Sequence, residues 1–216
     1  MSSDFLATMA ASSAGRAERA QKLRPASVLL DFLALLPPPV SLRTSDAGFD
    51  LIAELKLRSP AQGQLKAAGS EDIAKRVLSY AKAGAAAVSV LTEPSRFDGS
   101  MGHLERAARA LIETGIPAMR KDFLVHPYQV LEARAAGAGG VLVILRMLPR
   151  DLLEPLIDTA IEHGLFVLLE AFDDVDIELA HELVAARPAA RALLLVGVNC
   201  RDLVTLQVMP GHLEKH

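Results

Sequence analysis

Three charged residues end a short apolar run in the segment IPAMRKDFLV (116–125). Side chains alternate faces along a strand, so Lys121 shares a face with Phe123, while Arg120 and Asp122 point the other way. A single lysine above an apolar layer is costly to desolvate unless carboxylates surround it. The pattern therefore predicts that acidic residues from other strands lie beside Lys121.

Five further polar residues stand at the ends of other apolar runs. Glu54 and Lys56 share one face of the first run, Glu170 closes another, and Asn199 and Arg201 follow the last. Together with the lysine above, such a set could bind an anion, donate a proton and accept one. Each residue also has a structural interpretation: Glu170 could cap the following helix, and Asn199 could serve a turn.

An alternation of apolar runs and helical segments positions these groups. The expected strands are 50–56, 85–92, 116–122, 140–146, 165–171 and 192–199, and the expected helices are 70–84, 100–115, 127–137, 149–164 and 173–186. Ser70 is the candidate N-cap of the first helix. The strands are near-continuous Val, Leu, Ile and Ala, which is typical of a parallel sheet covered by crossover helices. The sequence thus predicts an α/β fold.

Two architectures fit this pattern, an open doubly wound sheet and a closed (β/α) barrel. No GxGxxG or GxxxxGK[ST] segment follows the first strand, so nothing favours a nucleotide-binding open sheet. Polar groups recur at the C-terminal ends of the strands, which meet at one mouth in a (β/α)8 TIM barrel. We therefore expect an incomplete barrel of about six βα units, whose sheet has two open edges.

The composition excludes several classes of protein. With 216 residues, 51% hydrophobic residues and a net charge of −3, the chain can form one sizeable core but has no broad basic field. Nucleic acid is therefore not expected as a partner. A membrane is not expected either, because the apolar stretch at 27–40 is too short to span a bilayer. The single cysteine, Cys200, excludes an internal disulfide framework and fits a reducing, cytoplasmic setting.

Five segments resemble the indole-3-glycerol phosphate synthase family in order and spacing. They are IAELKLRSPAQGQL (52–65), VSVLTEPSRFDGS (88–100), RKDFLVHPYQVLEARAAGA (120–138), LLEAFD (168–173) and GVNCRDLVTL (197–206). The combination of I-A-E-x-K-x-x-S-P, R-K-D-F and G-x-N-x-R-D-L belongs to that family. The resemblance covers about residues 15 to 213. It implies an N-terminal helical extension, here 1–48, before a partial barrel catalytic domain, here 49–216.

The resemblance implies a decarboxylating ring closure in tryptophan biosynthesis. Its substrate is a small phosphorylated molecule, 1-(2-carboxyphenylamino)-1-deoxyribulose 5-phosphate, and no metal or organic cofactor is expected. A ring carbon attacks the ribulose carbonyl, so a general acid must reach the carbonyl oxygen. By the motif match, Lys121 is that acid. Lys56 lies by the phosphate and hydroxyls as an acid of the later dehydration, and Glu170 is the general base of that step.

The resemblance also assigns supporting positions. Glu54 and Asn199 match residues that hold the lysines and the substrate, and Arg201 matches a contact to the anthranilate carboxylate. The residues expected to line the pocket are Ser59, Phe97, Phe123, Leu142 and Leu203.

The sequence departs from the family at its C-terminal end. The family's seventh and eighth strands, which supply most of the phosphate site, have no counterpart here, so a truncated chain is expected. The alternative is a non-catalytic barrel fragment that associates with itself or another chain through its open edges. Another phosphate-binding barrel, such as phosphoribosylanthranilate isomerase, is disfavoured because that enzyme uses a Cys/Asp pair and has no R-K-D-F segment.

Overall fold

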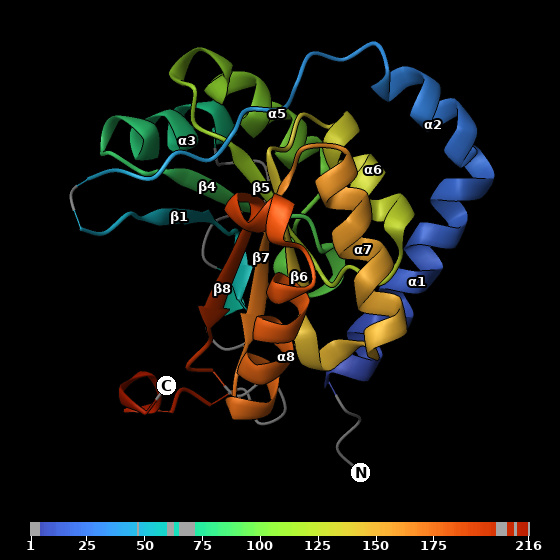
Figure 1. Cartoon of the computed structure of the whole chain (residues 1–216). Coiled ribbons are helices and arrows are strands. Elements are labelled where there is room, and N and C mark those ends of the chain that lie inside the picture. Colours follow the sequence, from blue (N-terminus) through green and yellow to red (C-terminus); the bar gives the residue numbers. More distant parts are fainter. Residues whose placement is uncertain are drawn as a thin grey trace.

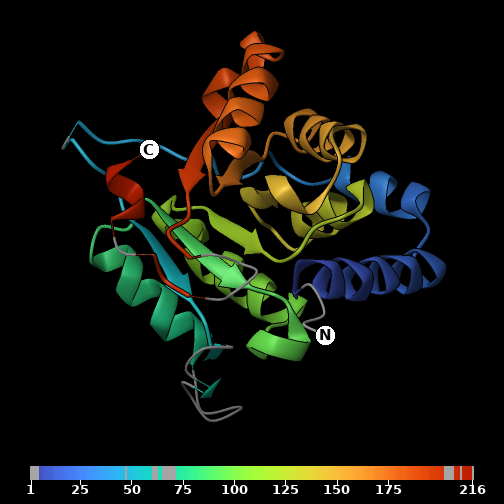
Figure 2. The same cartoon turned by 90° about the horizontal axis from the view of Figure 1, so that it is seen from below.

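Six parallel strands form one curved sheet. A computed structural model describes residues 5–46, 48–59, 63–64, 72–201, 207–209 and 211–215 of the chain. The strands are β1 (Ile52–Leu55), β4 (Ala87–Leu91), β5 (Ala118–Lys121), β6 (Gly140–Ile144), β7 (Phe166–Ala171) and β8 (Leu194–Val198). Each pairs with the next in that order, and no pairing joins β1 to β8 within the described residues. The expected incomplete barrel with six strands is confirmed (Figures 1 and 2).

Five helices connect successive strands, as the alternation in the sequence predicts. They are α3 (Ile73–Lys82), α5 (Met101–Leu111), α6 (Pro127–Ala135), α7 (Arg150–Glu162) and α8 (Asp174–Ala185). Short 3-10 turns are η1 (Ile112–Thr114), η2 (Leu145–Met147), η3 (Pro188–Leu193) and η4 (His212–Glu214). The predicted N-cap of α3 is wrong: Asp72, not Ser70, accepts a hydrogen bond from the backbone N of Lys75 (3.0 Å). Asp72 lies next to the first helical residue, where a cap must stand.

Two short elements that the sequence did not predict lie after strands of the sheet. The helix α4 (Pro94–Phe97) follows β4, and the carboxylate of Glu93 caps its first turn. The strands β2 (Arg58–Ser59) and β3 (Gly63–Gln64) form a small antiparallel hairpin after β1. Elements of two to four residues carry too little periodicity to be recognised from sequence.

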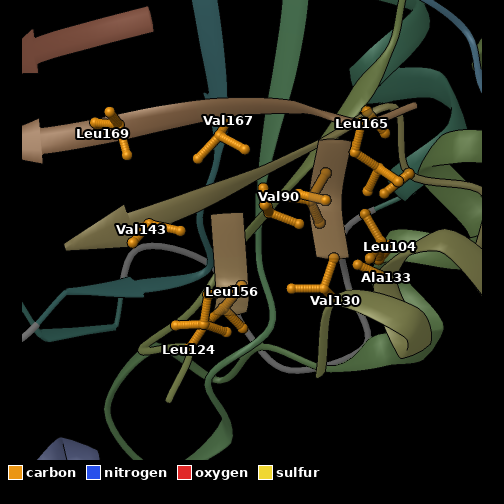
Figure 3. Close-up of a cluster of buried hydrophobic side chains, with 14 of the residues drawn as sticks. Val90, Leu104, Leu124, Val130, Ala133, Val143, Leu156, Leu165, Val167 and Leu169 are labelled. Atoms are coloured by element: carbon orange, nitrogen blue, oxygen red, sulfur yellow. The ribbon is translucent and has the colours of Figure 1, made fainter. Parts of the chain in front are cut away.

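The two faces of the sheet contribute to different cores. The outer face packs under the helices in a large apolar cluster, in which Val90, Val143, Val167 and Leu169 come from strands and Leu104, Val130 and Leu156 from helices (Figure 3). The inner face carries a smaller apolar cluster that includes Ala87, Met119 and Phe166. Polar side chains on the inner face therefore stand beside an apolar layer, which makes unpaired charges there costly.

Two N-terminal helices, α1 (Phe5–Leu23) and α2 (Ala26–Leu33), pack beside α6 (Figure 1). Leu29 and Leu33 of α2 contact Leu131 of α6. The hydroxyl of Tyr128, also on α6, donates to the carbonyl oxygen of Arg24 (2.8 Å). The boundary at residues 48 and 49 stays a prediction. No helix in the described part of the chain is long and apolar enough to cross a membrane.

Gly140 is expected to be required for packing of the inner face. A Cβ at Gly140 would overlap the ring of Phe166 on the neighbouring strand, so Gly140→Ala should lower the free energy of unfolding by about 1–3 kcal/mol. Gly102→Ala is the matched control, because its new Cβ would lie 3.7 Å from Ser100 Oγ, an ordinary van der Waals distance. Urea denaturation of both variants tests this, and equal effects would contradict it.

Candidate active site

Three charged side chains meet at the C-terminal ends of β1 and β5. Glu54 lies on β1, Lys56 follows that strand, and Lys121 ends β5. One carboxylate oxygen of Glu54 accepts from Lys56 Nζ (2.5 Å), and the other pairs with Lys121 Nζ (2.7 Å). The structure thus brings Lys121 to Glu54 and Lys56, which the sequence placed on a different strand.

The lysines determine the ionisation of Glu54. Burial raises the pKa of its carboxyl, but the charges and hydrogen bonds of Lys121 and Lys56 together lower that pKa below its ordinary value. Glu54 therefore stays a carboxylate at neutral pH. A fixed anion between two ammonium groups holds both of them toward the inside of the sheet.

An open pocket of about 230 Å³ extends from Lys121 on β5 to the ends of β7 and β8. Its lining includes Lys121, Glu170 on β7 and Asn199 just after β8. Glu170 does not cap the next helix, because the side chain of Asp173 accepts the capping hydrogen bond at α8. An acid and a base on separate strands can therefore act on one molecule in this pocket.

Asn199 both lines the pocket and serves a turn. Its side-chain oxygen accepts from the backbone N of Arg201 (2.9 Å), and its own backbone N donates to the carbonyl oxygen of Ala171 (2.8 Å). Arg201 lines an adjoining depression together with Glu170 and Asn199. The two interpretations that the sequence left open for Asn199 are thus compatible.

An apolar cluster forms beside these charges. Phe123 and Leu142 are buried in it, and Phe97 at the end of α4 packs against it. The rings of Phe97 and Phe123 have centroids 6.2 Å apart. Three of the five predicted pocket residues are thus neighbours. The side chain of Ser59 and the whole of Leu203 lie outside the described residues.

Sequence reasoning missed the part of this cluster that comes from α1. Leu6 and Met9 are buried in it, and the ring of Phe5 meets Phe123 edge to face at 5.7 Å. The contact joins residues more than a hundred positions apart. No local pattern could reveal it, since an amphipathic helix does not specify which surface it covers.

Arg120 and Asp122 lie on the opposite face from Lys121, as the alternation predicts. They are 3% and 2% exposed and form an ion pair at 3.2 Å. Asp122 also accepts from the hydroxyl of Thr92 (2.8 Å) and from the guanidinium of Arg16 on α1 (2.6 Å). This buried network attaches α1 to the outer face of β5, directly behind Lys121 at the end of that strand.

Comparison with known proteins agrees with this geometry. The family model described as indole-3-glycerol phosphate synthase matches residues 36–215. The chain belongs to the indole-3-glycerol phosphate synthase family. It is 49% identical over 162 residues to the indole-3-glycerol phosphate synthase of Nocardioides sp., covering 75% of this chain and 57% of that protein. With the Leifsonia xyli enzyme of the same name it shares 38% identity over 208 residues, covering 95% of this chain and 75% of the relative.

Among solved structures, a Xanthomonas albilineans dihydropteroate synthase matches with a TM-score of 0.41 and 20% identity, over 57% of this chain and 50% of that one. So weak a likeness carries no argument. The indole-3-glycerol phosphate synthase family has the TIM-barrel fold, and the described partial barrel accounts for six of its eight strands.

Arg16 is expected to stabilise this family member through its contact with Asp122. Replacing Arg16 by Met leaves a buried carboxylate with fewer donors, so the free energy of unfolding should fall by about 1–3 kcal/mol. Lys22→Met on the same helix is the control, because Lys22 pairs with Glu18 in an exposed position and should matter little. Urea denaturation tests this, and similar losses in the two variants would refute it.

The lowered pKa of Glu54 should make the fold sensitive to acid. Ionised Glu54 contributes stability above its ordinary pKa of 4.5, and this contribution is lost as the pH falls through the lower folded-state pKa. Lys121→Met removes a cation that lowers the pKa of Glu54 against the effect of burial, so this stability should be lost from a higher pH onward. Melting temperatures measured from about pH 3 to pH 7 test this. Lys82→Met, which replaces an exposed lysine, is the control and should follow the parent profile. Superimposable profiles for the parent and Lys121→Met would contradict the prediction.

Proposed function

We propose that this chain is an indole-3-glycerol phosphate synthase. It would convert 1-(2-carboxyphenylamino)-1-deoxyribulose 5-phosphate to indole-3-glycerol phosphate, releasing one carbon dioxide and one water. The observation that supports this most directly is the Glu54 carboxylate, which holds Lys56 and Lys121 at 2.5 and 2.7 Å beside a pocket that Glu170 also lines. The substrate and the place in tryptophan biosynthesis follow from the family.

Lys121 is proposed as the acid of ring closure. The ring carbon that bears the carboxylate attacks the ribulose carbonyl carbon, and Lys121 Nζ gives a proton to the carbonyl oxygen as the carbon–carbon bond forms. Loss of carbon dioxide then returns its electron pair to the ring. Lys121 suits this role because it ends a strand paired on both sides, which fixes its backbone.

Lys56 and Glu170 are proposed to act in the dehydration that follows. Lys56 protonates the departing hydroxyl, which leaves as water, and Glu170 accepts a proton from the ring system to restore aromaticity. Lys56 follows β1 and Glu170 lies on β7, so they stand at separate positions along the sheet, which suits a step in which one proton enters and another leaves. Glu54 and Asn199 are positioning groups in this scheme.

The remaining predicted residues are proposed to bind the substrate. Arg201 would pair with the anthranilate carboxylate, because a guanidinium matches a carboxylate in geometry and charge. Phe97, Phe123 and Leu142 offer an apolar surface for the aromatic ring. Ser59 and Leu203 are proposed as further contacts. Acid and base catalysis by side chains accounts for each step of the reaction, so we propose no metal or organic cofactor. We also propose a cytoplasmic location.

A second candidate function rests on the open edges of the sheet. Neither β1 nor β8 pairs with a second strand among the described residues, and such edges can pair with another chain. In that case the chain would be a non-catalytic member of the family that associates with itself. Turnover by a monomer of the 216-residue chain would exclude this alternative.

Lys121→Ala is expected to reduce ring closure by at least about 100-fold, since general acid catalysis typically contributes that much. The fluorescence of the indole product measures turnover by the purified chain. Lys82→Ala, an exposed lysine on α3, is the control and should keep parental activity. Unchanged turnover in Lys121→Ala would overturn the acid assignment. A parent chain without turnover that sediments as a dimer would support the second candidate instead.

A further inference from the structure

One buried hydroxyl on the inner face of the sheet has no hydrogen-bond partner. Ser89 lies in the middle of β4 and is 3% exposed, and its Oγ, closed off from solvent, bonds to no group in the described residues. No other buried side-chain nitrogen or oxygen of those residues is left in this state. An unpartnered buried hydroxyl costs stability, and such groups are few in native proteins, so its presence requires a reason.

The register of the sheet places Ser89 level with Glu54. On one side Ser89 is the partner of Glu54 on β1, and on the other side it is the partner of Met119 on β5. Paired residues of neighbouring parallel strands point to the same face and lie about 4.8 Å apart. Met119 offers only a weakly accepting thioether. The Glu54 carboxylate is therefore the strong acceptor level with the Ser89 hydroxyl.

Both oxygens of that carboxylate already have cationic partners. Oε1 accepts from Lys56, and Oε2 pairs with Lys121. The two ammonium groups are stronger donors than a hydroxyl, and in the free protein they hold the carboxylate while Ser89 Oγ makes no hydrogen bond. The departure of one lysine from Glu54 would open an acceptor site for Ser89.

We propose that Ser89 is a positioning residue, which replaces Lys121 on the Glu54 carboxylate when Lys121 turns to the substrate. The proposal rests on the assignment of Lys121 as the acid of ring closure. Once Lys121 has given its proton to the carbonyl oxygen, its amine is neutral and no longer attracts Glu54. The Ser89 hydroxyl then rotates about its Cα–Cβ bond and donates to Oε2. Glu54 stays in place, and Lys121 returns to the same position when it is protonated again.

A double-mutant cycle on stability tests this without any need for turnover. In the parent, Ser89→Ala should leave the melting temperature unchanged or raise it, because it removes an unpartnered hydroxyl. In the Lys121→Met variant, where Ser89 is expected to bond Glu54 permanently, Ser89→Ala should lower the melting temperature by about 2–4 °C. Ser89→Thr keeps the hydroxyl and should restore most of that loss. An equal effect of Ser89→Ala in both backgrounds would overturn the proposal.

The titration of Glu54 gives a readout that a purely structural serine would not move. With carbon-13 NMR of the labelled carboxyl, Ser89→Ala should raise the pKa of Glu54 in the Lys121→Met variant, because the carboxylate loses a donor. With Lys121 and Lys56 both present, Ser89→Ala should not change it. A pKa that moves alike in both backgrounds, or in neither, would count against the proposal.

Turnover separates this inference from the proposed function. Ser89→Ala should lower kcat about threefold to tenfold, the effect of one lost hydrogen bond, and leave KM within about twofold. Ser89→Thr should recover most of the rate. If the parent chain shows no turnover, the proposed function fails, while the stability cycle and the Glu54 titration still decide whether Ser89 exchanges with Lys121. A parental kcat in Ser89→Ala would overturn the catalytic part of the inference.

Discussion

The shared carboxylate of Glu54 is the interaction on which the candidate site depends. It lies partly buried next to an apolar layer, where a lone charge of either sign would be costly. Two lysines make its ionised form favourable, and it in turn keeps two ammonium groups close together despite their mutual repulsion. Removing Glu54 leaves two ammonium groups without their counter-ion, and removing either lysine leaves the partly buried carboxylate with one cation instead of two. The cluster therefore has to be considered as a unit, in stability as in chemistry.

A second charged network on the opposite face of β5 makes this unit more rigid. Because side chains alternate, Lys121 projects inward while its neighbours Arg120 and Asp122 project outward into a buried ion pair. Arg16 of α1 completes that pair, and the same helix sends Phe5 against Phe123. The N-terminal helix thus contacts Asp122 on the outer face and Phe123 on the inner face, both close to Lys121 at the end of β5. A helix far away in sequence limits how far this lysine can move.

The parts of this arrangement that follow short-range rules could be predicted from the sequence. The runs of Val, Leu and Ile identified all six strands, and alternation separated Lys121 from Arg120 and Asp122. The N-cap of α3 was misplaced because Ser, Asp and Glu cluster before that helix and any of them could cap it. Arg16 and Phe5 could not be found, since their partners are fixed only by how α1 lies on the barrel. Ser89 was equally hidden, because a serine in an apolar strand has no significance until the register sets it beside Glu54.

The order of the strands determines how firmly each group of the site is held. Lys121 ends β5, which pairs with β4 on one side and β6 on the other, whereas Glu54 lies on β1, which within the described part of the chain pairs only with β4. The backbone therefore fixes the lysine more firmly than it fixes the carboxylate. The ion pair between them spans β4 and supplies the restraint that β1 does not receive from a second neighbour. Glu54 thus orients the lysines and also ties an edge strand to the centre of the sheet, so any group that holds Glu54 while Lys121 is engaged elsewhere also preserves the position of β1.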